Sequence, residues 1–81
     1  MKLWTSPHFD TRYRNAPIAV RRAMKKQMLL LVQDIRYPSL HAKKYDESQG
    51  IWQARVTKGW RFYFTIRGDT YELHDIKLHP K

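Results

Sequence analysis

Arginine and aromatic side chains alternate between Gly50 and Gly68 in a pattern suited to holding phosphate. If this stretch forms two strands around a tight turn, one face carries a basic and aromatic set: Gln53, Arg55, Arg61, Tyr63 and Arg67. Guanidinium groups bind phosphate oxygens through paired hydrogen bonds, and a tyrosine ring offers a surface on which a base stacks. The pattern therefore indicates nucleic-acid binding. The residue types also fit an ordinary solvated sheet face, in which the charges prevent aggregation.

Further candidates for chemistry lie on either side of this stretch. Lys43 and Lys44 precede it in an expected loop, and His79 lies at the end of the last expected strand, where its ring could reach the edge of the basic face. Histidine exchanges protons near neutral pH, so His79 is a candidate proton donor. The other histidines are interpreted as surface or structural residues: His8, His41 and His74. The chain has no cysteine and no HxxxH or HExxH pair, so we expect neither a metal nor a cofactor.

The composition points to a polyanionic partner. The 81 residues include 16 Lys and Arg against 7 Asp and Glu, a net charge of +9. With 42% hydrophobic residues the chain should fold, and its length predicts a single domain over residues 1–81. We find neither a signal-peptide pattern nor an apolar run long enough to cross a membrane, so we expect a cytoplasmic protein without membrane contact.

The apolar periodicity predicts the elements that must position these side chains. An opening strand is expected over residues 2–5, followed by a short helix that starts at Ser6 and Pro7 and ends near Asn15. Residues 17–37 repeat apolar side chains at helical spacing, and residues 39–49 are expected to form a loop. Two strands then surround Lys58 and Gly59. A second hairpin leads into a last strand whose apolar pattern changes phase between residues 73 and 76, which favours a bulge or a strand buried on both faces.

This order predicts an α+β fold in which two N-terminal helices pack on one face of a small twisted antiparallel sheet. The expected sequence of elements is strand, helix, helix and three strands. The helices should cover the face that carries an aromatic set: Trp52, Trp60, Phe62 and Phe64. The arginine face would remain open.

Three segments together resemble a known family. "YPSLHAKKY" after the long helix, "GIWQARVTKGWRFYF" and the terminal "LHP" are similar to the RelE/ParE superfamily of toxins from bacterial type II toxin-antitoxin modules. The RelE-like branch cuts mRNA in the ribosomal A site without a metal. By that resemblance Arg61 would stabilise charge at the scissile phosphate, Arg55 would hold the phosphate, and His79 would act as general acid. Lys43 and Lys44 would match the basic residues ahead of the sheet.

The resemblance leaves the activity open between two branches. Many nucleolytic members have a tyrosine near the terminal histidine, so here Tyr63 or Trp60 would have to supply stacking, and Glu47 is the only base suggested. A ParE-like inhibitor of DNA gyrase, which acts by binding, and a non-toxic basic nucleic-acid-binding relative are the alternatives. Either toxin reading implies a cognate antitoxin, with a free monomer that forms a hetero-oligomer with it. The nuclease reading adds the ribosome and mRNA as partners.

Overall fold

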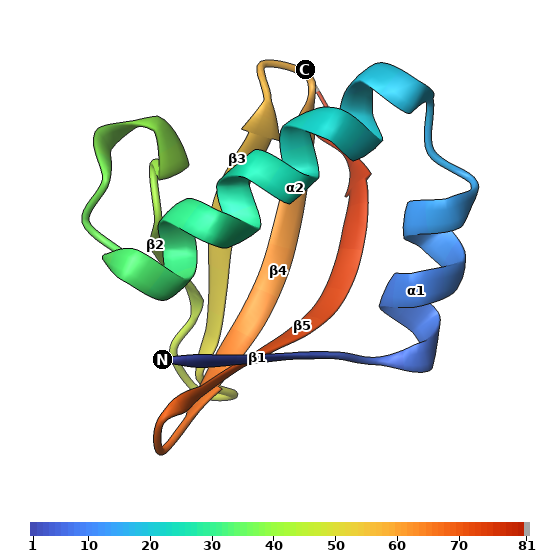
Figure 1. The fold of residues 1–81 in the computed structure, drawn as a ribbon. Helices are drawn as coiled ribbons and strands as arrows, with labels where there is room; N and C mark the ends of the chain where they lie inside the picture. Colours follow the sequence, from blue (N-terminus) through green and yellow to red (C-terminus); the bar gives the residue numbers. More distant parts are fainter. Residues whose placement is uncertain (81) are drawn as a thin grey trace.

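The computed structural model describes residues 1–80 and shows two helices on one face of a five-stranded sheet (Figure 1). The elements are β1 (Lys2–Thr5), α1 (Pro7–Arg14), α2 (Ile18–Gln33), the short 3-10 helix η1 (Pro38–Leu40), β2 (Lys43–Asp46), β3 (Ile51–Thr57), β4 (Trp60–Arg67) and β5 (Thr70–Leu78). The predicted α+β class is confirmed.

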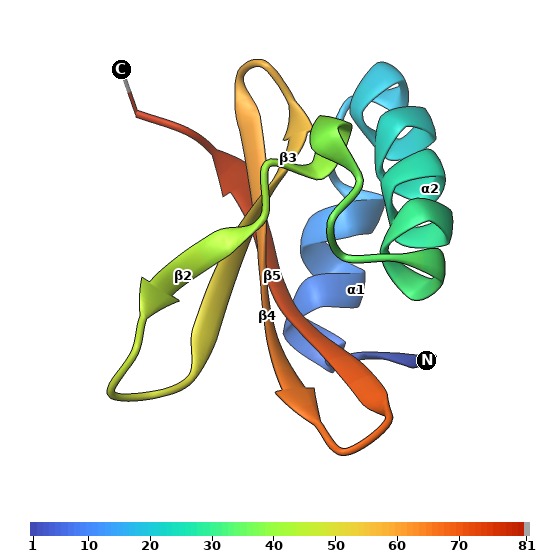
Figure 2. The ribbon, with the colours of Figure 1, turned by 90° about the vertical axis from the view of Figure 1, so that its left-hand side faces the viewer.

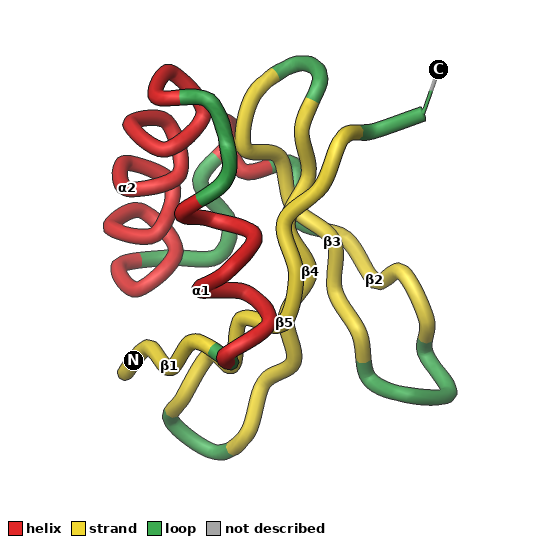
Figure 3. The backbone as a smooth tube through the Cα atoms, turned by 90° about the vertical axis from the view of Figure 1, so that its right-hand side faces the viewer, coloured by secondary structure: helices red, strands yellow, loops and turns green. Residues whose placement is uncertain are grey.

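The sheet is mixed, whereas the sequence predicted a wholly antiparallel one. Its strand order is β1-β5-β4-β3-β2, and β1 runs parallel to β5 while the other neighbours are antiparallel. The direction of β1 follows from α1, which starts directly after it and lies along β5 (Figure 3). Arg12 of α1 donates to the Ile76 carbonyl at 3.2 Å, and this bond holds the helix against the strand.

Local signals explain the helix boundaries. The Ser6 hydroxyl accepts a hydrogen bond from the Phe9 amide at 3.0 Å, and Pro7 occupies the first turn of α1, as predicted. The second helix ends at Gln33, four residues before its predicted limit, because Asp34 takes an extended conformation (φ −165°). The Asp34 carboxylate accepts from the Arg36 amide and side chain, and these bonds hold its pKa below the usual value. Within residues 1–80 neither helix is long and apolar enough to span a bilayer.

The core lies between α2 and the helix-facing side of the sheet. Phe62 and Phe64 of β4 are fully buried, with ring centroids 5.6 Å apart, and pack with Met24 and Leu31 of α2. The predicted aromatic face is confirmed, although Trp52 and Trp60 are only partly buried.

The structure differs from the predicted loop over residues 39–49. This range contains the end of η1 and all of β2, and backbone pairing to β3 holds β2 at the edge of the sheet (Figure 2). β2 escaped prediction because three of its four residues are exposed, which leaves no apolar alternation to detect. The predicted change of phase in the last strand is a bulge at His74, since Tyr63 pairs with Asp75 and Phe64 with Leu73.

Candidate functional site

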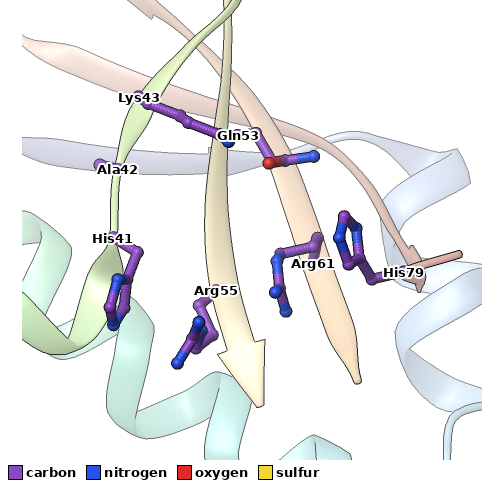
Figure 4. A pocket seen from close by; sticks show the side chains of 7 residues that line it. All are labelled: His41, Ala42, Lys43, Gln53, Arg55, Arg61 and His79. Carbon is purple, nitrogen blue, oxygen red and sulfur yellow. The ribbon is translucent and has the colours of Figure 1, made fainter. Parts of the chain in front are cut away.

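A pocket of about 330 Å³ opens on the side of the sheet that faces away from the helices (Figure 4). The pocket lies over β3 and β4. One side is formed by the start of β2 and the residues just before it, and the other side by the residue that follows β5. Its lining residues are His41, Ala42, Lys43, Gln53, Arg55, Arg61 and His79. No carboxylate among residues 1–80 lines the pocket, so its charge is wholly positive.

Arg61 is held rigidly by the turn between β3 and β4. Its Nη1 atom donates to the carbonyl of Thr57 at 2.8 Å and to the carbonyls of Trp60 and Lys58 at 3.0 and 3.1 Å. A guanidinium has five N–H donors, so these bonds leave those on Nε and Nη2 for an anion in the pocket. Burial lowers the pKa of Arg61, and the charge of Arg55 lowers it further. The guanidinium of arginine stays protonated in proteins, so Arg61 still carries its charge at neutral pH.

Arg55 lies directly opposite Arg61 in the pairing of β3 with β4. Two like charges across a strand pair repel, and an anion between them would remove this cost. Among the described residues, the buried Nε atom of Arg55 has no hydrogen-bond partner. The arrangement favours phosphate binding over a purely structural role.

Gln27 fixes the backbone on two sides of the pocket. This buried α2 residue donates from Nε2 to the carbonyl of Arg55 at 2.8 Å and to that of Ser39 in η1 at 2.9 Å. Gln27 was not predicted from the sequence. Its signal was a polar residue on the apolar face of the long helix, three positions after Met24.

His41 enters the pocket directly after η1, although the sequence analysis placed it on the general surface. Its backbone is left-handed (φ 46°), a conformation that is uncommon for residues other than glycine and that reverses the chain between η1 and β2. The adjacent "AKK" gave no sign of this turn. His41 could have been found only from the position of η1.

His79 reaches the pocket from the other side. Its amide donates to the Gly59 carbonyl at 2.8 Å, which ties the end of β5 to the β3–β4 turn. Figure 4 shows the His41 and His79 rings on opposite sides of the two guanidinium groups.

The remaining predicted site residues divide between the two sides of the sheet. Lys43 lines the pocket, whereas Lys44 lies over the ring of Trp52, 6.0 Å from its centroid. Arg67 is exposed at the far end of β4, where its Nη1 atom lies 3.9 Å from Glu72. Tyr63 shares the face but does not line the pocket, and it is only 7% exposed.

Metal ligation has no obvious place in this arrangement. Across residues 1–80 no three histidine, aspartate or glutamate side chains gather as a metal ion would require. The pocket instead offers the cations of Lys43, Arg55 and Arg61 and two imidazoles.

The fold is that of small bacterial and archaeal toxins, as comparison with solved structures shows. The YoeB/ParE toxin from Agrobacterium tumefaciens is 15% identical, with a TM-score of 0.81 over 99% of this chain and 100% of that one. YafQ from E. coli is 16% identical, with a TM-score of 0.74 over 96% of this chain and 92% of that one. The chain matched in the RelB-RelE antitoxin-toxin complex from Methanococcus jannaschii is also 16% identical, at a TM-score of 0.74 and covering 93% and 88%.

No family model matches the chain, and no curated protein matches it in sequence. The RelE/ParE resemblance is therefore confirmed as a shared fold. Activity has to be argued from the pocket.

Proposed function

We propose that this protein is the toxin of a type II toxin-antitoxin module and that it cuts mRNA on the ribosome in the cytoplasm without a metal. One observation carries the proposal: two arginines lie opposite each other in a pocket flanked by two histidines. The shared fold with YoeB/ParE, YafQ and RelE toxins supports the toxin role.

The pocket residues supply each group that RNA cleavage by an internal nucleophile needs. The 2′-hydroxyl oxygen attacks the adjacent phosphorus, and the bond from phosphorus to the 5′-oxygen of the next nucleotide breaks. This reaction yields a 2′,3′-cyclic phosphate and a 5′-hydroxyl. Arg61 and Arg55 neutralise the charge that develops on the phosphate oxygens, and Lys43 holds the neighbouring backbone.

The two histidines serve as proton acceptor and donor. Attack and departure occur on opposite sides of the phosphorus, so base and acid must also lie on opposite sides. We assign His41 as the base that takes the proton of the 2′-hydroxyl and His79 as the acid that protonates the leaving 5′-oxygen. Glu47, the base suggested by the sequence, lies in the turn between β2 and β3 and does not line the pocket.

An acidic, amphipathic antitoxin segment is the proposed protein partner. The helix side carries an apolar groove between β1 and α2, lined by Leu3, Met28, Leu29 and Val32 with Lys25 beside them. Leu29 is 64% exposed. A contiguous apolar groove on so basic a protein suits a helix with one apolar and one acidic face. The RelB-RelE complex, and a DinJ-YafQ complex from E. coli whose structure this chain also resembles, support a protein partner.

The test is 5′-end mapping of a defined message on programmed ribosomes, with the same RNA alone as a control. The unmodified protein should cut at A-site codons, and Arg61→Ala should lower the rate by about 10²- to 10³-fold, as expected for loss of a charge-stabilising donor. His41→Ala and His79→Ala should each lower it as well. Arg22→Ala, an exposed arginine on α2, is the matched control and should cut normally.

A message that stays intact would reject the nuclease. Inhibition of gyrase supercoiling would then favour the ParE-like alternative. If growth also continued in a host without the antitoxin, the toxin role itself would be refuted.

A further inference from the structure

Tyr45 presents an exposed aromatic ring beside the phosphate pocket. The residue is 58% exposed and lies on β2, two residues beyond Lys43 of the pocket lining. Two residues along a strand span about 6.6 Å, so the ring lies close to the pocket mouth. Tyr45 ends the segment "YPSLHAKKY", but neither the resemblance nor the proposed mechanism gives it a role.

The Tyr45 ring packs on Tyr63, which Gln53 and Lys77 contact in turn. It meets Tyr63 edge-on, with centroids 5.0 Å apart and planes at 68°. The Tyr63 hydroxyl accepts a hydrogen bond from the Gln53 side chain at 2.9 Å, and the Lys77 ammonium lies 4.9 Å from the Tyr63 centroid. Tyr63 is therefore fixed at its hydroxyl and over its ring, and it supports Tyr45 from below.

Tyr45 lies on the pocket side of β2, at an irregularity in the strand pairing. Lys44 pairs with Trp52 and Asp46 with Ile51, so Tyr45 is an extra residue in β2. Such bulges are common next to functional sites. Lys44 turns to the Trp52 side of the sheet while Tyr45 contacts Tyr63 on the pocket side.

We propose that Tyr45 is the platform on which a base of single-stranded RNA stacks, next to the phosphate held by Arg55 and Arg61. The inference rests on the proposed RNA substrate and gives it a second point of contact. Tyr45 also replaces the two residues expected to supply stacking, because Tyr63 lies beneath Tyr45 and Trp60 packs against the core. A duplex keeps its bases stacked on one another, so the platform selects unpaired RNA.

The experiment measures binding of a four-nucleotide RNA by fluorescence anisotropy. Every ribose carries a 2′-O-methyl group, which removes the nucleophile and prevents cleavage. The RNA is compared with versions that lack one base at each position in turn, using the unmodified protein and Tyr45→Ala. Tyr45→Phe tests whether the ring suffices, and Tyr37→Ala, an exposed tyrosine outside the pocket lining, is the matched control.

Loss of one stacked base should weaken binding about 5- to 150-fold. We expect Tyr45→Ala to show this loss with the intact RNA and the unmodified protein to show it when one particular base is missing. Combining the two changes should cost no more than either alone, because they remove the same contact. Tyr45→Phe and Tyr37→Ala should bind as the unmodified protein does.

Three results would overturn the inference: unchanged binding by Tyr45→Ala, fully additive losses at every position, or no binding of the intact RNA by the unmodified protein. The proposed function is tested separately on ribosomes. If the losses from Tyr45→Ala and from one missing base are not additive, but no message is cut on ribosomes, stacking on Tyr45 is supported and the nuclease activity is rejected. If messages are cut but the two losses are additive, the nuclease activity is supported and stacking on Tyr45 is rejected.

Discussion

Replacing Gln27 with leucine should destabilise both the fold and the pocket. The side chain keeps nearly the same size, but the two hydrogen bonds from Nε2 to the carbonyls of Arg55 and Ser39 are lost. The Arg55 carbonyl then faces an apolar side chain from α2. The Ser39 carbonyl belongs to an exposed residue and can turn toward water.

The structure sets the size of the expected loss. A buried carbonyl without a partner costs about 1–3 kcal/mol, and loss of an ordinary hydrogen bond costs about 0.5–1.5 kcal/mol. The two together give a decrease of about 1.5–4.5 kcal/mol in the free energy of unfolding. In a domain of this size that decrease corresponds to a fall in melting temperature of roughly 6–36 °C.

Urea unfolding followed by tryptophan fluorescence measures this loss, since Trp52 and Trp60 pack against the core. Gln33→Leu makes the same chemical change at an exposed position on the same helix and should cost less than about 0.5 kcal/mol. Ribosomal cleavage by Gln27→Leu should also fall at temperatures where the variant is folded, because His41 follows η1 directly. Equal stability of Gln27→Leu and the unmodified protein would refute the reasoning.

Three other substitutions test separate parts of the structure. Arg61→Lys keeps the charge but loses the planar donor fork, so end mapping on ribosomes should show cleavage about 10²-fold slower; an unchanged rate would contradict a bidentate role. Phe62→Ala empties a fully buried position and should cost about 3–5 kcal/mol in urea unfolding; a loss below about 1 kcal/mol would contradict the packed core. Burial raises the pKa of the Tyr71 hydroxyl above its ordinary 10.0, so its stabilising contribution is complete below pH 10.0 and disappears as the pH rises through the folded pKa. Tyr71→Phe should therefore lose less stability than the unmodified protein when the pH is raised from 9 to 11, as measured by urea unfolding at both pH values. Equal losses in the two proteins would show that Tyr71 has no such effect.

Elements with strong local signals were predictable from the sequence. The alternation in β3 and β4 identified the buried side of the sheet, because both strands have one face in the core. Ser6 and Pro7 located the start of α1 for an equally local reason. These signals depend on neighbours in the chain, which the sequence contains directly.

The pocket depends on contacts between distant residues, and its prediction was only partial. Arg55, Arg61, His79 and Lys43 were expected and lie together, and their roles remain predictions. His41 was missed because only a left-handed turn after η1 brings it to the pocket. Tyr63 was expected at the surface, but Tyr45 of β2 and Lys77 of β5 cover its ring. Period-two alternation predicts the face on which a side chain lies, but it does not show whether other side chains cover it.

The position of β5 between β1 and β4 determines the order in which the sheet can form during synthesis. The first strand pairs with residues 70–73, so it has no partner until these residues have been translated. The nascent chain up to Asp69 can form α2 and the β3–β4 hairpin, but β1, α1 and the free edge of β4 all wait for β5. Because β5 also leads into His79, the complete pocket arises only with this last strand. A chain interrupted within β5 would therefore leave β1 and α1 without part of their partner strand, and it would leave the pocket without His79.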